Sequence, residues 1–182
     1  MDDPSEKGAG NPYESTELLD QYLLFHYGAA DEVLPHPGGP RDALDFAVRT
    51  VGENLDTGHR CDRALDLGCA VGRSSFELSR FCDEVIGIDF SESFVKAAER
   101  IGAGEEIAFR RLEEGSLTSG LHAAAPAGAH PERVRFEVGD ACNLRADLGS
   151  FDIVHAANLI CRLPDPQSLL SRLPGLVNTG GQ

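Results

Sequence analysis

The chain has 182 residues, enough for one domain with a sizeable core and few for two. It carries 30 acidic and 16 basic residues, a net charge of −14 with histidine neutral. Phosphate backbones and anionic lipid repel such a chain, so this balance argues against a nucleic-acid or membrane-surface function. No apolar run is long enough to span a bilayer, and the acidic start is unlike a secretory signal. We therefore expect a folded cytoplasmic protein.

The five cysteines are odd in number and show no C-x-x-C spacing. This usage favours reduced thiols and disfavours structural zinc, so we predict no metal site. The cysteines are Cys61, Cys69, Cys82, Cys142 and Cys161.

The first sixty residues are predicted to form a tail and a helical cap. Residues 1–10 are polar and are expected to be disordered, and residues 11–60 form the cap. Asn11 precedes a proline and is expected to begin a helix that Gly28 ends. After a loop rich in proline and glycine, a second amphipathic helix is predicted, with a buried side of Leu44, Val48, Val51 and Leu55.

From residue 61 to residue 182, short apolar runs alternate with helical patterns. The runs cover residues 63–67, 85–88, 134–138 and 151–155. This alternation is typical of a doubly wound α/β domain with a parallel sheet. A connection at about 102–132 is much longer than usual and rich in Ala, Gly and Pro, so we expect a functional lid or a disordered insertion there.

The strongest motif is LDLGCAVGRS, at residues 65–74, where a predicted strand leads into a helix. Gly68 and Gly72 are expected to let the backbone approach a ligand where a Cβ would collide. The next strand ends in Asp89, which is placed to accept hydrogen bonds from both ribose hydroxyls. Asp140 and Ala141 follow the third strand at the same edge. The acid can accept from an adenine amino group, and the alanine leaves room for the ring.

The turn does not have the G-x-G-x-x-G pattern of a dinucleotide site, and Asp66 stands two residues before its first glycine. A carboxylate is a poor neighbour for a pyrophosphate and a good one for a cation. A sulfonium cofactor with an amino-acid tail therefore fits better than NAD. The alternative is a tight strand–helix turn of an ordinary α/β protein.

The segments LDLGCAVGRSS, VIGIDFS, FEVGDACNL and FDIVHAANLICRLPDP resemble, in this order, the motifs of class I S-adenosylmethionine-dependent methyltransferases. The resemblance implies a Rossmann-like sheet and S-adenosylmethionine as cofactor. A sheet of this class has seven strands, so we expect a domain truncated after its fourth strand and the following helix, with two extra N-terminal helices. Ala70 departs from the glycine of many members.

The same resemblance implies the cofactor-binding residues. The stretch from Asp66 through Gly72 would hold the methionine part, Asp89 the ribose, and Phe90 would pack near the adenine. The implied set is Asp66, Gly68, Cys69, Ala70, Gly72, Asp89, Phe90, Asp140, Ala141 and Asn158, the last lining the methyl-transfer site.

A narrower resemblance covers nearly the whole chain. NPYES, LLDQYLLFHYG, EEGSLT and GDACNLRADLG are similar to segments of the methyltransferase domain of ovothiol synthase. This resemblance implies an enzyme that methylates an imidazole ring nitrogen of mercaptohistidine. It also implies a sulfoxide synthase partner, as a domain or as another chain.

Four side chains outside the cofactor motifs are candidates for substrate binding: Tyr13, His26, Tyr27 and Arg162. A guanidinium can hold the carboxylate of an amino-acid substrate with two hydrogen bonds. His155 is a candidate general base, with a core histidine as the alternative interpretation. Two further hypotheses stay open: a methyltransferase for another small acid or amine, and an inactive cofactor-binding fragment.

Overall fold

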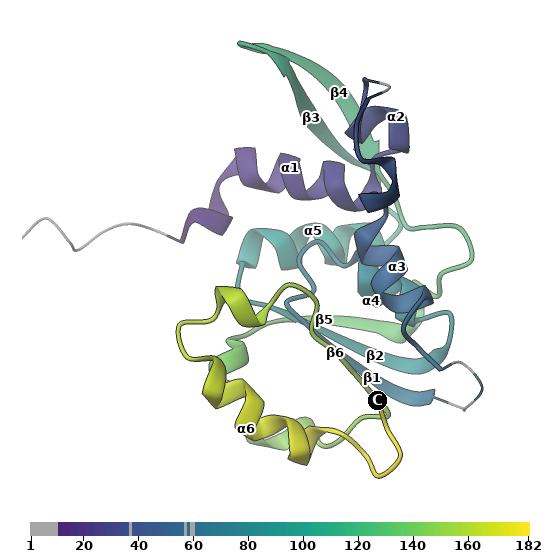
Figure 1. Ribbon diagram of the computed structural model, residues 1–182, viewed down its shortest axis with the longest axis vertical. Coiled ribbons are helices and arrows are strands. Elements are labelled where there is room, and N and C mark those ends of the chain that lie inside the picture. The colour runs from purple at the N-terminus through teal and green to yellow at the C-terminus, as the bar shows by residue number, and fades with distance from the viewer. Residues whose placement is uncertain (1–10, 37, 57, 59–60) are drawn as a thin grey trace, which may run out of the picture.

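The computed structural model describes residues 11–36, 38–56, 58 and 61–182, and the structural statements below concern these residues. The predicted disordered tail at 1–10 lies outside them. Four strands form the central sheet in the order β5-β2-β1-β6, and every neighbouring pair is parallel (Figure 1). The strands are β1 (Cys61–Leu67), β2 (Cys82–Asp89), β5 (Val134–Val138) and β6 (Ile153–His155). The predicted α/β fold is confirmed, and the carboxyl ends of all four strands meet at one edge.

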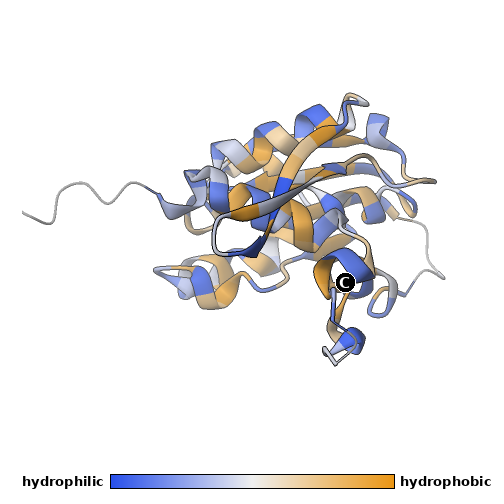
Figure 2. Ribbon diagram, turned by 90° about the horizontal axis from the view of Figure 1, so that it is seen from above, coloured by the Kyte–Doolittle hydropathy of each residue, from blue (hydrophilic) through white to orange (hydrophobic). Residues whose placement is uncertain are grey.

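Helices cover both faces of this sheet, as a doubly wound fold requires. In Figure 1, α4 (Arg73–Leu78) and α5 (Glu92–Gly102) lie above the sheet and α6 (Pro166–Leu176) lies below it. The helices carry both apolar and polar segments, because each has one face in the core and one in solvent (Figure 2). The largest fully buried side chains include Phe76 and Phe94 above the sheet and Leu169 and Leu176 below it. None of the helices within the described ranges is long and apolar enough to cross a membrane.

Among its described residues, the cap contains three α-helices rather than the predicted two, together with two short 3-10 turns. Asn11 caps a short 3-10 turn over Pro12–Glu14, where its Oδ1 accepts from the Tyr13 N–H at 3.1 Å. Helix α1 (Thr16–Tyr27) begins only after Ser15, and it ends at Gly28 as predicted. A helix that was not predicted, α2 (Ala30–Val33), follows α1. Helix α3 (Phe46–Gly52) is shorter than expected: Leu44 and Leu55, which were predicted to lie on its buried side, are outside it.

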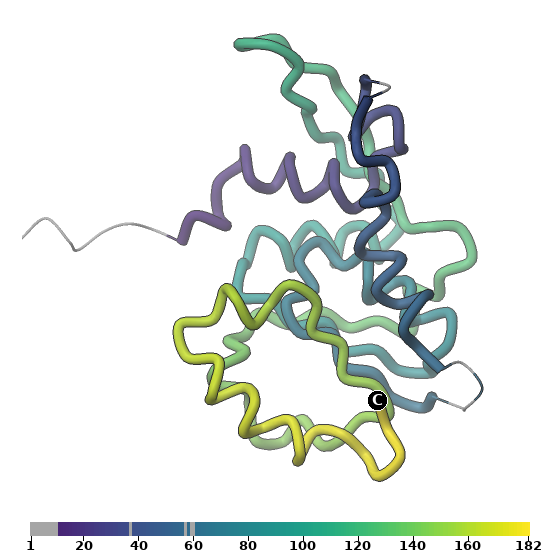
Figure 3. Tube along the Cα trace, viewed as in Figure 1, coloured from purple at the N-terminus to yellow at the C-terminus, as the bar shows by residue number. Residues whose placement is uncertain are grey.

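The long connection is an ordered hairpin, so the expectation of a disordered insertion is wrong. Strands β3 (Ile107–Glu114) and β4 (Leu117–Ala123) pair antiparallel and project away from the central sheet (Figure 3). Ile107, Phe109 and Ala123 are buried in the same apolar cluster as Leu23 of α1. The alternation of buried and exposed residues at the start of β3 is the signal that the Ala, Gly and Pro content obscured.

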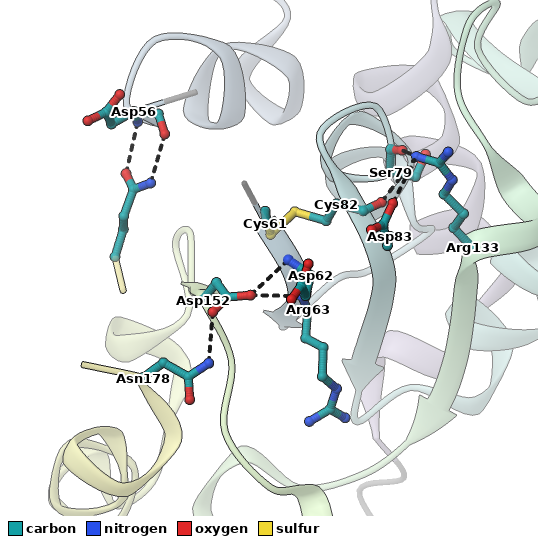
Figure 4. The surroundings of a disulfide bond; sticks show 11 residues. Asp56, Cys61, Asp62, Arg63, Ser79, Cys82, Asp83, Arg133, Asp152 and Asn178 are labelled. Atoms are coloured by element: carbon teal, nitrogen blue, oxygen red, sulfur yellow. Dashed lines mark hydrogen bonds and ion pairs between the residues drawn. A yellow bond between two sulfur atoms is a disulfide. The ribbon is translucent and has the colours of Figure 1, made fainter. Parts of the chain in front are cut away.

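Cys61 and Cys82 form a disulfide, so the expectation of reduced thiols is wrong for this pair (Figure 4). Each is the first residue of its strand, and the parallel register places them opposite each other with 4.6 Å between the Cα atoms. Cys69, Cys142 and Cys161 are free. The bridge lies at the amino end of the strands, at the edge opposite to the motif turns.

Candidate active site

The turn after β1 depends on three residues with positive φ: Gly68 at 71°, Ala70 at 47° and Gly72 at 85°. It is fastened to the end of β2, since the Gly68 N–H donates to the Ile88 carbonyl at 2.8 Å. A Cβ on Gly72 would lie 2.7 Å from Phe136 and 2.9 Å from the Ala98 Cβ. The reason expected for this glycine, room for a ligand, is therefore corrected: Gly72 makes room for the core of the protein itself.

The Asp89 carboxylate joins the two motif loops at the end of β2. Its Oδ2 accepts from the Ala70 N–H at 2.8 Å, and its Oδ1 accepts from the Ser91 N–H at 2.9 Å. Burial raises the pKa of Asp89 above its ordinary value despite these two donors. Each carboxylate oxygen keeps a lone pair, so Asp89 can still accept from the hydroxyls of a ligand.

The Asp66 carboxylate is enclosed behind the turn and is only 1% exposed. Its Oδ2 accepts from the hydroxyls of Ser74 at 2.7 Å and Ser75 at 2.6 Å, and its Oδ1 lies 2.8 Å from His155 Nδ1. Burial alone would raise the pKa of Asp66, but His155 and the two hydroxyls hold it below its ordinary value. The expectation that this carboxylate itself holds a methionine group does not fit the geometry, because its oxygens face protein groups.

The adjoining edge of the sheet presents an exposed aromatic ring and an exposed acid. Phe90 follows β2 and is 63% exposed, an unusual state for a phenyl ring on a protein surface. Asp140 follows β5, and its Oδ1 accepts from the Cys142 N–H at 2.8 Å, whereas no donor in the described part of the chain reaches its Oδ2. Ala141 beside it is buried. Cys69, by contrast, is buried inside the turn, where burial raises the pKa of its thiol well above the ordinary value.

A cavity of about 610 Å³ lies next to this edge, within the size range of small-molecule sites. It brings together four of the predicted residues, Tyr13, His26, Asn158 and Arg162. The backbone of Asn158 is left-handed, with φ of 53°, a conformation that asparagine tolerates better than most residues. Sequence reasoning missed further lining residues, among them Gln21, Tyr22, Phe25, Asp45 and Phe46.

Tyr27 is not a lining residue of this cavity, contrary to the prediction. Its hydroxyl donates to the Val71 carbonyl at 2.7 Å, so the end of α1 supports the turn after β1. Arg73 strengthens the same junction, because its guanidinium lies 5.7 Å from the centre of the Tyr27 ring and donates to the His26 carbonyl. The helical cap and the turn therefore form one continuous structure.

Glu14 and Tyr13 anchor the other end of the cap. The Glu14 carboxylate accepts from the N–H groups of Glu92 and Ser93, and so caps α5 from a distant part of the sequence. The Tyr13 carbonyl accepts from the Ser91 and Ser93 hydroxyls at 3.0 Å each. These bonds fix the Tyr13 ring, which packs edge-on against Tyr22 at 6.2 Å between centroids.

His26 contributes a neutral ring to the cavity wall. It stacks on Tyr22 with 5.7 Å between centroids, and its Nδ1 is buried without a hydrogen-bond partner among the residues described. Burial lowers the pKa of His26 to about 4, against the attraction of Asp66. The spacing of four residues between Tyr22 and His26 is the sequence signal that could have added Tyr22 to the candidate site.

Comparison with known proteins shows the family of the α/β part of the chain. A family model described as "Methyltransferase domain" matches residues 65–182. The YcgJ protein from Bacillus subtilis is similar in structure, at 20% identity and a TM-score of 0.51, over 75% of this chain and 46% of that chain. The glycopeptide N-methyltransferase MtfA matches at 19% identity and a TM-score of 0.53, over 75% of this chain and 51% of that one.

A third similar structure is an S-adenosylmethionine-dependent methyltransferase from Clostridium acetobutylicum. It is 17% identical, with a TM-score of 0.53, over 78% of this chain and 50% of that chain. At such identities the likeness is one of fold. The chain spans about half the length of the solved structures that it matches.

Proposed function

Since the chain belongs to the methyltransferase domain family, we propose that it methylates an imidazole ring nitrogen of mercaptohistidine, the reaction of ovothiol biosynthesis. The observation that carries the proposal is the position of the aromatic cavity. It lies at the carboxyl edge of the sheet and is lined by Tyr13, His26, Asn158 and Arg162. The second candidate is a methyltransferase for a different small acid or amine. The family match covers residues 65–182 and does not include the helical cap, which lines most of the cavity, so it leaves the substrate open.

S-adenosylmethionine is the cofactor, and the residues at the edge of the sheet fit it. The exposed Phe90 ring offers a surface for the adenine, and the free Oδ2 of Asp140 offers an acceptor for its amino group. Asp89 would bind the ribose hydroxyls, and the backbone of the turn would follow the methionine part. When bound, this cofactor supplies a methyl group on a sulfonium, an electrophile that is already activated.

The chain's own task is then to position the nucleophile and to exclude water. Proximity and orientation of this kind contribute about 7–11 kcal/mol to lowering a barrier. An imidazole nitrogen with a free lone pair needs no base before it reacts. We therefore assign His155 to positioning rather than to proton abstraction: Asp66 raises its pKa, which disfavours the neutral form that a base requires.

On the substrate side, Arg162 would hold a carboxylate and the rings of Tyr22 and His26 would stack on the imidazole. The neutral state of His26 suits this contact, because the substrate ring becomes cationic as it accepts the methyl group and a charged histidine would repel it. A sulfoxide synthase domain or chain would supply the substrate.

Two measurements test this function in order. Isothermal titration calorimetry with S-adenosylhomocysteine is expected to show binding that Asp89→Ala weakens strongly and that Asp42→Ala, in an exposed turn, leaves unchanged. Incubation with S-adenosylmethionine and 5-mercaptohistidine, followed by mass spectrometry, is expected to give the N-methylated product, with histidine as the poorer substrate. Binding of the cofactor without methylation of mercaptohistidine would favour the second candidate, and absence of cofactor binding would refute both.

A further inference from the structure

The aromatic cavity has one acidic and one basic lining residue, Asp45 and Arg162. No ion pair joins them, although their charges are opposite. A ligand that carries both charges can therefore occupy the space between them. The remaining lining residues are uncharged. They include His26, which is neutral because burial lowers its pKa to about 4.

Arg162 stands out among the arginines in the described part of the chain. Its guanidinium takes part in no hydrogen bond or ion pair there, whereas each of the others has a polar partner; even Arg172 donates to the Arg145 carbonyl. Such a state is notable in a protein with 30 acidic residues, because acceptors are abundant. Arg162 is the last residue of the 3-10 turn Ile160–Arg162 after β6, and its exposed side chain lines the cavity.

Asp45 is the N-cap residue of α3, but its backbone is left-handed rather than extended. It precedes α3 with φ of 57° and ψ of 29°, in the left-handed region, and its side chain makes no capping hydrogen bond to the helix. Aspartate in its common extended conformation would cap α3, a contribution of about 1 kcal/mol. The left-handed backbone forgoes this bond, and within the described ranges the carboxylate makes no hydrogen bond or ion pair. The nearby charge of Arg49, whose pKa Asp45 helps to raise, is not in direct contact with it.

Aromatic side chains complete the cavity between these charges. The Tyr22 and His26 rings stack, Tyr13 packs edge-on against Tyr22, and Phe46 lies next to Asp45 in the sequence. Phe46 is 47% exposed and Phe25 is 62% exposed, although both line the cavity. A flat ring is the ligand group that such a wall accepts best.

We propose that Asp45 and Arg162 together hold a zwitterionic amino acid in the cavity, Asp45 the ammonium group and Arg162 the carboxylate, with its flat side chain against Tyr22 and His26. This inference rests on the proposed function, since it identifies the groups that would recognise the substrate of that reaction. It adds a residue, Asp45, that the sequence did not indicate. It also disfavours free amines and free acids as ligands, because each of them makes only one of the two charge contacts.

The test uses three probes that share one ring: L-histidine, histamine without the carboxylate, and imidazolepropanoate without the ammonium group. Calorimetry on the whole chain is expected to show L-histidine binding about 3- to 5-fold more tightly than either analogue. Asp45→Asn is expected to reduce the affinity for L-histidine to that for imidazolepropanoate, and to leave the affinity for imidazolepropanoate itself unchanged. Arg162→Gln is expected to reduce the affinity for L-histidine to that for histamine, and to leave the affinity for histamine itself unchanged.

Matched variants separate recognition from folding. Asp45→Gly also removes the carboxylate and suits φ of 57° better than any other residue, so it should fold even if Asp45→Asn does not. Asp42→Asn and Arg172→Gln remove charges outside the cavity and are expected to change no probe affinity. Equal affinities for the three probes, no binding of L-histidine, or an unchanged preference in both Asp45 variants would overturn the proposal. Binding of S-adenosylhomocysteine is measured on every variant, so that loss of the cofactor site is distinguished from loss of the zwitterion site.

Discussion

His155 and Asp66 form a buried pair in which the histidine Nδ1 lies 2.8 Å from the aspartate Oδ1. They come from neighbouring parallel strands and are register partners, β6 beside β1. Burial alone would lower the pKa of His155, but the Asp66 carboxylate raises it above its ordinary value. Asp66 therefore favours the protonated form of His155, and the protonated pair carries no net charge.

Asp66→Asn is expected to lower the pKa of His155 to below that of a free histidine. The substitution removes the charge that stabilises the imidazolium, whereas the burial that opposes it remains. NMR titration of the imidazole ring protons measures this shift directly. Asp45→Asn, which removes a carboxylate elsewhere, serves as the control and should leave the His155 titration in place. A His155 titration that is the same in Asp66→Asn and in the wild-type protein would show that the pair is not electrostatically coupled.

His26 is expected to make the protein less stable in acid. Its pKa is about 4 in the folded state and near 6.5 in the unfolded state, so between these values the unfolded chain binds the additional proton. The free energy of unfolding therefore falls as the pH decreases from 6.5 to 4, by up to about 3 kcal/mol. Urea unfolding over this range should show a smaller decrease for His26→Phe, which keeps a ring against Tyr22. An equal decrease in both proteins would contradict the assignment to His26.

Gly72→Ala is expected to cost about twice as much stability as Gly104→Ala. The two glycines have nearly the same φ, 85° and 87°, so the backbone strain of an alanine is similar at both, about 1–2 kcal/mol. A Cβ at Gly104 meets nothing within 4 Å, whereas a Cβ at Gly72 meets Phe136 at 2.7 Å. The additional clash should cost about 1–3 kcal/mol more. Thermal unfolding of the two variants measures the difference, and similar losses in both would show that the Phe136 ring moves aside easily.

Reduction of the Cys61–Cys82 bridge is expected to destabilise the protein. The bridge closes a loop with a sequence separation of 21, for which chain entropy predicts about 3 kcal/mol of stabilisation. Addition of a reducing agent should therefore lower the unfolding temperature of the wild-type protein. A double variant with alanine at positions 61 and 82 should start from the lower value and not respond to the reductant. If the wild-type protein is equally insensitive, the two thiols are not bridged in solution.

The sheet was predictable because its four strands are short apolar runs bounded by polar or small residues, a pattern with few alternatives. The motif acids Asp89 and Asp140 were predictable for a related reason: residues that follow parallel strands must meet at one edge. The β3–β4 hairpin was not, because its buried residues are few and widely spaced within a polar segment.

The set of residues that line the cavity could not be predicted from short sequence motifs. His26 and Arg162 are far apart in sequence, and only the docking of the cap onto the turn and onto α5 brings them to one wall. Tyr27 was predicted to bind the substrate because it stands with His26 at the end of the first predicted helix, but neighbouring residues on a helix point in different directions. The disulfide was missed because strand register, which pairs Cys61 with Cys82, cannot be derived from cysteine spacing.

The hydrogen bond between the Tyr27 hydroxyl and the Val71 carbonyl has a mechanical consequence. Helix α1 contributes to the cavity wall, and the turn that contains Val71 lies at the edge where we propose that the cofactor binds, so this bond connects the two proposed ligand surfaces. A displacement of α1 on filling of the cavity would pull on the same backbone that shapes the turn. Occupancy of either surface would thus alter the affinity of the other by an equal factor, and the two ligands would bind cooperatively.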